Sequence, residues 1–307
     1  MNIAVGFVHG IGRQQEGFHL EMAAKLEERL AKACPEVKVY AEGIYWADIT
    51  DRLENKLKAK LAPYGLRWDH WADIRGYVIS FLADAIAYQP VPHEDDSAAN
   101  EYIYADIHER FCEKLQVLSD RAGPDAPLCL ISHSLGSIIA SNYVYDLQNG
   151  KLPARIRDRI KRSDSPLVQG HTLTHFYTMG SPIALWTMRY EDFGRPIDFP
   201  PQILREHGLP YGEWVNFYDK DDIIAYPLKS LSKLYDEAVS EDLEVSNPGW
   251  LANTPLGSHG GYYDSEAVMN RIVASWVELY NRTAERDETA AGSDIEEGEN
   301  RYNCFGN

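Results

Sequence analysis

Cysteine is scarce in this sequence, and the few that occur show no functional spacing. The 307 residues include four cysteines, none of which belongs to a CxxC pair: Cys34, Cys112, Cys129 and Cys304. The first ten residues, MNIAVGFVHG, lack the basic segment, apolar stretch and cleavage site of a secretory signal. We therefore expect a cytoplasmic protein with reduced thiols and no metal site built on cysteine.

Positive charge is also in short supply, and no long apolar run occurs. The chain has 30 basic and 47 acidic residues, which gives a formal net charge of −17. Because nucleic acids and anionic membranes attract basic patches, this balance argues against both as main partners. The longest apolar candidate, Tyr77–Tyr88, is interrupted by Ser80 and Asp84, so we expect no membrane-spanning segment. The stretch His93–Asp96 matches no common metal-ligand spacing, and we interpret it as a solvated acidic loop.

Short apolar runs alternate with helical patterns along most of the chain. This alternation is typical of an α/β fold with a mostly parallel central sheet and helices on both faces. The expected strands are Ile3–Val8, Val37–Trp46, Leu128–Ile131, Leu173–Met179, Trp214–Tyr218 and Ala238–Val245. The expected helices are Gly17–Ala33, Ile49–Leu61, Trp68–Tyr88, Ile103–Leu118, Leu135–Leu147 and Val268–Tyr280.

Two segments interrupt the alternation, and the tail differs from the rest in composition. We expect one domain over residues 1–282, with a helical insertion at 47–100 and an irregular, Pro- and Gly-rich insertion at 184–213. Residues 283–307 are acidic and poor in large apolar side chains, so we predict a disordered tail.

The sequence Ser132-His133-Ser134-Leu135-Gly136 follows an expected strand and opens an expected helix. This context is that of a nucleophile elbow, a sharp turn that exposes a serine Oγ above the sheet. Such a turn needs small residues two positions before and after the nucleophile. Gly136 fits this need, and Ser132 replaces the usual glycine. A plain helix N-cap is the simpler alternative, but the motifs below favour Ser134 as a nucleophile.

The sequence Val8-His9-Gly10-Ile11-Gly12 ends the first expected strand. Its glycines allow the backbone to approach the nucleophile, where two N–H groups are needed to bind an oxyanion. We predict that the backbone N–H groups of Ile11 and Leu135 form this oxyanion hole. A dinucleotide-binding loop is the rival interpretation, but Gln15 occupies the position of its third glycine. We interpret His9 as a packed loop residue.

A carboxylate and a histidine follow late in the chain. Asp219, Asp221 and Asp222 lie in the turn after the strand Trp214–Tyr218. We favour Asp222 as the acid because it directly precedes apolar residues that would anchor it, and Asp219 and Asp221 remain alternatives. His259 lies between serine and glycine before the last helix, on what we expect to be a flexible loop, and is the predicted base.

These residues resemble the α/β-hydrolase superfamily, and within it the bacterial lipase- and esterase-like serine hydrolases. The chain order Ser134, Asp222, His259 is the order of that fold. The resemblance covers about Asn2–Trp46, Ile103–Pro182 and Trp214–Tyr280, beginning at the family's third strand. It implies the α/β-hydrolase fold and acyl-transfer chemistry without cofactor or metal, but no particular substrate.

The expected function is hydrolysis of a small-molecule or lipid-like carboxylic ester through an acyl-enzyme. A thioesterase, amidase or acyltransferase would use the same triad. The alternative from another class is a non-catalytic binding protein on the same scaffold. We further predict that the first insertion is a helical cap, with Trp71 and Phe81 lining a pocket for a largely apolar substrate portion. Ordinary core packing of that helix is the competing interpretation.

Overall fold

A six-stranded, fully parallel sheet forms the centre of the protein. The computed structural model describes residues 1–11, 14–64, 84–89, 103–246 and 255–302. The strand order is β2-β1-β3-β4-β5-β6, and every neighbouring pair is parallel. This confirms the expected fold class. The strands are β1 (Asn2–Val8), β2 (Lys38–Ile44), β3 (Leu128–His133), β4 (Leu173–Met179), β5 (Glu213–Tyr218) and β6 (Glu241–Glu244).

Alternating side chains of the strands feed two separate cores, one on each face of the sheet. On β1, Ile3, Val5 and Phe7 pack in one core, together with α1 and α10. Ala4 and Val8 point to the other core, which contains side chains of α4, α5, α6, α7 and α8. The helices are α1 (Leu20–Ala33), α2 (Ala47–Leu61), α4 (Ile103–Ala122), α5 (Leu135–Gln148), α6 (Ala154–Lys161), α7 (Ile183–Thr187), α8 (Lys233–Ala238), α9 (Pro255–Gly260) and α10 (Glu266–Tyr302).

Three-residue and longer 3₁₀ turns fill several connections. In the segment expected to be irregular, 184–213, the chain forms most of α7 and two such turns. The helices α6 and α8 were not expected from the pattern. Ala238, expected in a strand, ends α8, and β6 begins only at Glu241. The turns are η1 (Ala62–Tyr64), η2 (Glu191–Phe193), η3 (Gln202–His207), η4 (Lys229–Leu231) and η5 (Gly261–Asp264).

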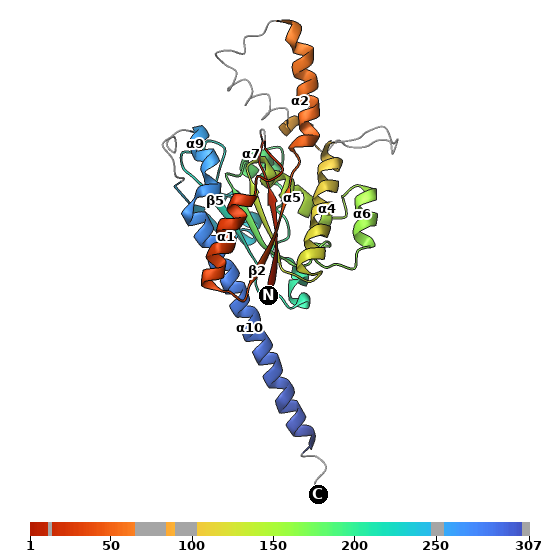
Figure 1. The fold of residues 1–307 in the computed structure, drawn as a ribbon, viewed down its shortest axis with the longest axis vertical. Coiled ribbons are helices and arrows are strands. Elements are labelled where there is room, and N and C mark those ends of the chain that lie inside the picture. The colour runs from red at the N-terminus through yellow and green to blue at the C-terminus, as the bar shows by residue number, and fades with distance from the viewer. Residues whose placement is uncertain (12–13, 65–83, 90–102, 247–254, 303–307) are drawn as a thin grey trace.

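The first insertion begins with α2, which projects from the body beyond the carboxyl edge of the sheet (Figure 1). Most of the expected helix Trp68–Tyr88 lies outside the described residues. At its end Tyr88 is fully buried, and its hydroxyl lies 2.8 Å from His108 Nε2 on α4. The insertion therefore starts on the side of the sheet where a cap is expected, and the cap itself stays a prediction.

The C-terminal segment differs from the sequence-based prediction. Disorder was predicted from Thr283 onward, whereas α10 continues as one helix to Tyr302 and extends away from the body (Figure 1). The prediction considered only the shortage of large apolar residues. The segment 283–302 contains five glutamates and three alanines, which have high intrinsic helix propensity.

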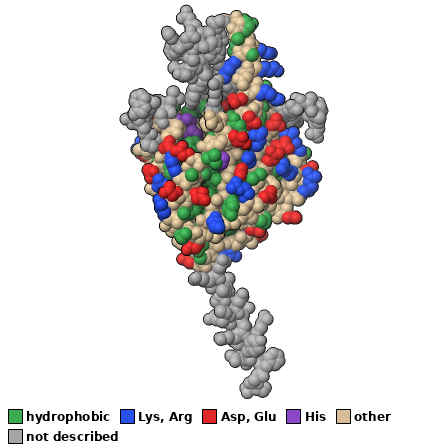
Figure 2. Space-filling view, in the orientation of Figure 1, with side chains coloured by type: hydrophobic (Ala, Val, Ile, Leu, Met, Phe, Trp, Pro, Cys, Tyr) green, Lys and Arg blue, Asp and Glu red, His purple; other side chains and the backbone are tan. Residues whose placement is uncertain are grey.

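Acidic and basic side chains are interspersed on the face shown in Figure 2. Along α4, for example, Lys114 and Arg121 both form ion pairs with Glu42 of β2. Among the described residues, no helix is both long enough and apolar enough to cross a bilayer.

An ion pair between the buried Glu213 and the partly buried Arg271 joins β5 to α10. Arg271 Nη1 and Nη2 donate to the two carboxylate oxygens of Glu213 at 2.8 and 2.7 Å. Burial raises the pKa of Glu213, but hydrogen bonds from Arg271, Ser275 and Tyr211 outweigh it and lower the pKa to about 2. The ionised carboxylate therefore ties the last helix to the sheet.

This pair predicts acid sensitivity. The stabilisation is complete above the pKa of an unfolded glutamate and is lost as the pH falls toward 2. Between pH 5 and 2, we expect the unfolding free energy of the wild type to fall by about 3 kcal/mol more than that of Glu213→Gln. Urea unfolding at each pH measures both. Glu241→Gln, which removes the more exposed carboxylate beside Arg271, should keep the wild-type slope. Identical slopes for Glu213→Gln and wild type would contradict the assignment.

Candidate active site

Ser134 occupies a strained turn between β3 and α5. Its φ of 52° and ψ of −129° lie in a region that side chains other than glycine rarely adopt. Its backbone N–H donates to Met179 O at 2.9 Å, which fixes the turn against the end of β4. Ser132, the departure from the usual glycine, is fully buried, and its Oγ donates to Tyr177 O at 2.8 Å. The position two residues before Ser134 therefore accommodates a serine in place of the usual glycine.

The structure brings Ser134 together with the predicted acid and base. His259 Nε2 lies 2.8 Å from Ser134 Oγ, and His259 Nδ1 lies 2.8 Å from Asp222 Oδ2. Of the three aspartates in the turn after β5, Asp222 is thus the one beside His259. Asp219 Oδ1 instead accepts the Asp221 N–H at 2.9 Å, and Asp221 is exposed.

His259 lies in a different local structure from the one expected. A flexible loop was predicted, whereas His259 belongs to the short helix α9, which ends at Gly260. The ring is mostly buried, with 8% of the residue exposed. Its position is nevertheless the predicted one, directly before the last long helix.

The surroundings of Asp222 favour the ionised carboxylate. Oδ1 accepts the Ile224 N–H at 3.1 Å, and Oδ2 accepts the Tyr262 hydroxyl at 3.0 Å. Burial alone raises the pKa of Asp222, but the hydrogen bond and charge of His259, with the Ile224 and Tyr262 donors, lower it overall. A charged Asp222 can orient His259 and stabilise its protonated form.

The loop after β1 lies directly against Ser134. A Cβ added to Gly10 would lie 2.6 Å from Ser134 Cβ, so only glycine fits there. A Cβ on Gly136 would likewise collide with the His9 and Val8 carbonyl oxygens. The two glycines thus let the loop and the start of α5 meet, which brings the backbone near Ile11 to Ser134.

His9 holds this loop in place. Its Nδ1–H donates to Gly10 O at 2.6 Å, its Nε2 accepts the Trp46 N–H at 3.1 Å, and its ring stacks on the Trp46 indole. Burial lowers the pKa of His9 to about 4, so the ring is neutral at neutral pH. The expectation that His9 is a packed loop residue is confirmed.

Sequence reasoning missed three residues around the histidine. His133 Nε2–H donates to the His259 carbonyl at 2.7 Å and so supports the backbone at His259. Gly180, after β4, has a φ of +57°, and a Cβ there would lie 2.8 Å from the Tyr262 ring and 3.2 Å from Asp222 Oδ2. Tyr262 is the third, because its hydroxyl also accepts the Asp219 N–H at 2.9 Å. Neither Gly180 nor Tyr262 belongs to a sequence motif that would signal its role.

The Tyr262 hydroxyl offers a test of how Asp222 is held. We expect Tyr262→Phe to lower kcat/KM for an ester about tenfold, since a hydrogen bond to the charged carboxylate is lost. Tyr263→Phe is the matched control, because the buried Tyr263 hydroxyl has no hydrogen-bond partner within the described part of the chain. Equal activity of both variants and wild type would show that Asp222 does not depend on Tyr262.

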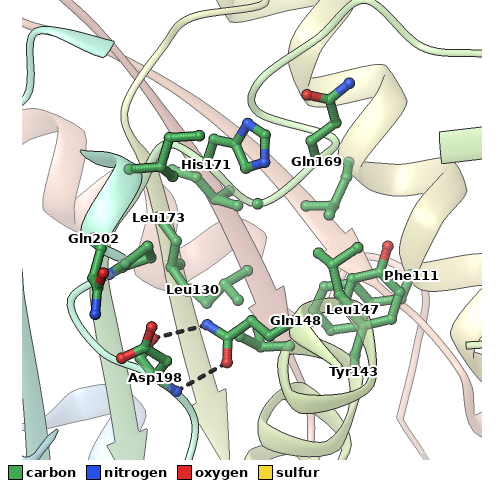
Figure 3. Close-up of a pocket in the computed structure, with 16 residues that line it drawn as sticks. Phe111, Leu130, Tyr143, Leu147, Gln148, Gln169, His171, Leu173, Asp198 and Gln202 are labelled. Carbon is green, nitrogen blue, oxygen red and sulfur yellow. Dashed lines mark hydrogen bonds between the residues drawn. The ribbon is translucent and has the colours of Figure 1, made fainter. Parts of the chain in front are cut away.

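The pocket drawn in Figure 3 lies away from these residues. Its volume is about 420 Å³, and its walls include Leu128 and Leu173, the first residues of β3 and β4. Gln148 Nε2 donates to Asp198 O at 2.8 Å, and Asp198 N–H donates to Gln148 Oε1 at 2.9 Å. Because Ser134 follows the opposite, carboxyl end of β3, we assign this pocket no part in the chemistry.

Several predicted features fall outside the described residues. Trp71 and Phe81, the proposed pocket residues, are among them, as are the acidic stretch His93–Asp96 and Cys304. The other three cysteines are free and buried. Both predicted oxyanion donors lie within the described residues. Leu135 is the first residue of α5, so its N–H has no acceptor within the helix, and Ile11 follows Gly10 in the loop after β1.

Comparison with known proteins gives distant structural neighbours. No protein-family model and no curated protein matches the chain. A structure from a study of two Rhizomucor miehei esterases is 12% identical (TM-score 0.42), with 91% of this chain and 75% of the other covered. An esterase from Pyrobaculum calidifontis is 11% identical (TM-score 0.38; 89% and 75% covered). The NocB thioesterase domain, solved in covalent complex with a fluorophosphonate nocardicin G analogue, is 13% identical (TM-score 0.32; 92% and 94% covered).

These similarities are too low to indicate a function. The fold assignment rests on the elements of the chain itself. The sheet is parallel, a strained serine turn follows β3, an aspartate follows β5 and a histidine precedes the last helix. In this arrangement and this chain order, the protein has the α/β-hydrolase fold.

Proposed function

We propose that the protein is a serine hydrolase that cleaves carboxylic esters through an acyl-enzyme. The observation that carries the proposal is the continuous hydrogen-bonded series from Ser134 Oγ to His259 and from His259 to Asp222, each link 2.8 Å long. A non-catalytic scaffold has no need of a strained serine aligned with a buried histidine and carboxylate.

The geometry supports a two-step mechanism. His259 Nε2 takes the Ser134 proton as Oγ attacks the ester carbonyl, and Asp222 stabilises the protonated ring. The Leu135 and Ile11 N–H groups are proposed to bind the oxyanion, aided by the positive end of the α5 dipole. His259 then protonates the departing alcohol. In the second step His259 takes a proton from water as the water oxygen attacks the acyl carbonyl. His259 then returns this proton to Ser134 Oγ as the carboxylic acid leaves.

A panel of substrates tests the reaction class. We expect hydrolysis of p-nitrophenyl esters, with slower turnover of acyl thioesters and of p-nitroanilides. A strong preference for thioesters or anilides would move the protein to the thioesterase or amidase alternative. Comparing acetate with longer acyl chains tests the proposed apolar substrate portion and the roles of Trp71 and Phe81.

A further inference from the structure

A second pocket flanks the helix that begins at the nucleophile. Its volume is about 300 Å³, and it lies between α5, α7 and the segment 189–195. Ile138, Asn142 and Tyr145 of α5 form one wall, and Trp186 of α7 forms part of another. No carboxylate side chain is among the residues that line it.

The charge of this pocket is opposite to that of the protein. Lys151, Arg189 and Arg195 all line it, although the chain carries a net charge of −17. Within the described residues none of these three cations forms an ion pair, whereas many other lysines and arginines do. Three cations around one cavity whose lining residues include no carboxylate make it attractive to an anion.

Aromatic rings hold two of the cations at the pocket. The Arg189 guanidinium lies 5.3 Å from the centre of the Trp186 ring and 4.9 Å from that of Tyr190. Lys151 Nζ lies 4.8 Å from the centre of the Tyr145 ring. A guanidinium packed on ring faces keeps its N–H edge available for the oxygens of an anion, and the rings themselves favour a flat apolar group.

Unused hydrogen-bond donors point to the same ligand chemistry. Arg189 Nη1 donates to Gln89 Oε1 at 3.2 Å, which uses one of its five N–H groups. Trp186 Nε1 is buried and has no acceptor among the residues that the structure describes. A buried donor without a partner is costly, and an oxygen of a bound anion would satisfy it.

We propose that this pocket binds a small organic anion, with a flat apolar body and one carboxylate, phosphate or sulfonate group. The site is next to the candidate active site but separate from it. Ile138 follows Ser134 by one turn of α5, about 6 Å along its axis. Ser137 of α5 and Ser181, just before α7, are both buried, and their Oγ atoms are 2.7 Å apart. Binding here does not depend on the proposed esterase function.

Calorimetric titration with a matched pair of probes tests the proposal. Naphthalene-2-sulfonate carries the anion, and naphthalene-2-sulfonamide has the same ring without the charge. We expect the wild type to bind the sulfonate at least tenfold more tightly than the sulfonamide. Arg189→Ala and Arg195→Ala should each weaken sulfonate binding about tenfold. Lys161→Ala, which removes an exposed cation of α6 outside the pocket, should leave it unchanged.

The melting temperature of each variant shows whether weaker binding comes from the lost contact or from unfolding of the protein. Arg189→Lys provides a milder change at the same position. Equal affinity for the two probes, or sulfonate binding that is unaffected by both arginine variants, would overturn the proposal.

The anion is either a group of the ester substrate or a separate molecule, and a kinetic comparison distinguishes these two sources. Mono-p-nitrophenyl glutarate carries a carboxylate, and p-nitrophenyl butyrate does not. A loss of kcat/KM in Arg189→Ala that is confined to the glutarate ester places the anion on the substrate. Equal kcat/KM changes for both esters assign the anion to a separate molecule that binds beside α5.

Discussion

Replacing Ser134 by alanine is expected to lower kcat for a p-nitrophenyl ester by about 10⁴-fold or more, because no other group can take over the covalent step. The fold should survive. Alanine keeps the same positive φ, so the strain of the turn is unchanged, and only the hydrogen bond to His259 is lost. We expect the unfolding free energy to change by about 1 kcal/mol or less.

Steady-state kinetics and thermal melting together measure this outcome. Ser132→Ala serves as a nearby control, since it removes only a buried hydrogen bond to Tyr177 O and should keep most of the activity. If Ser134→Ala retained more than a few per cent of wild-type activity, Ser134 would not be the nucleophile.

Replacing Asp222 by asparagine is expected to lower kcat by about 10⁴-fold, because the amide cannot stabilise the protonated His259 and favours the wrong tautomer. The 2.8 Å contact between Asp222 Oδ2 and His259 Nδ1 is the reason to expect so large an effect. Asp221→Asn is the matched control, since Asp221 lies in the same turn but is exposed. A large loss of kcat in Asp221→Asn, together with nearly full activity of Asp222→Asn, would show that Asp222 is not the acid.

The local parts of the site are the parts that sequence predicts well. The turn around Ser134 needs a strand, small residues two positions before and two positions after the serine, and a helix, and all of these are neighbours in the chain. The parallel sheet is similarly predictable, because buried strands such as Leu173–Met179 consist mostly of apolar, aromatic or β-branched residues. The expected and observed bounds of that strand agree residue for residue.

Features that depend on distant contacts were harder to predict. Three aspartates fit the turn after β5, and only the folded chain shows which one meets His259. Tyr262 and Gly180 have no motif of their own, since their relation to Asp222 arises only in the fold, where η5 and the residue after β4 both approach it. The helical C-terminal segment was missed for a different reason: composition was weighed for burial but not for helix propensity.

Covalent labelling by a fluorophosphonate is the most direct test of the central claim, because the probe reacts with a serine only when a neighbouring base activates it. Intact-mass and peptide mass spectrometry of the labelled protein locate the adduct. The account predicts one adduct per chain, on the peptide that contains Ser134, and its absence from Ser134→Ala and from heat-denatured protein. An unlabelled native protein, or an adduct on another serine that persists in Ser134→Ala, would contradict it.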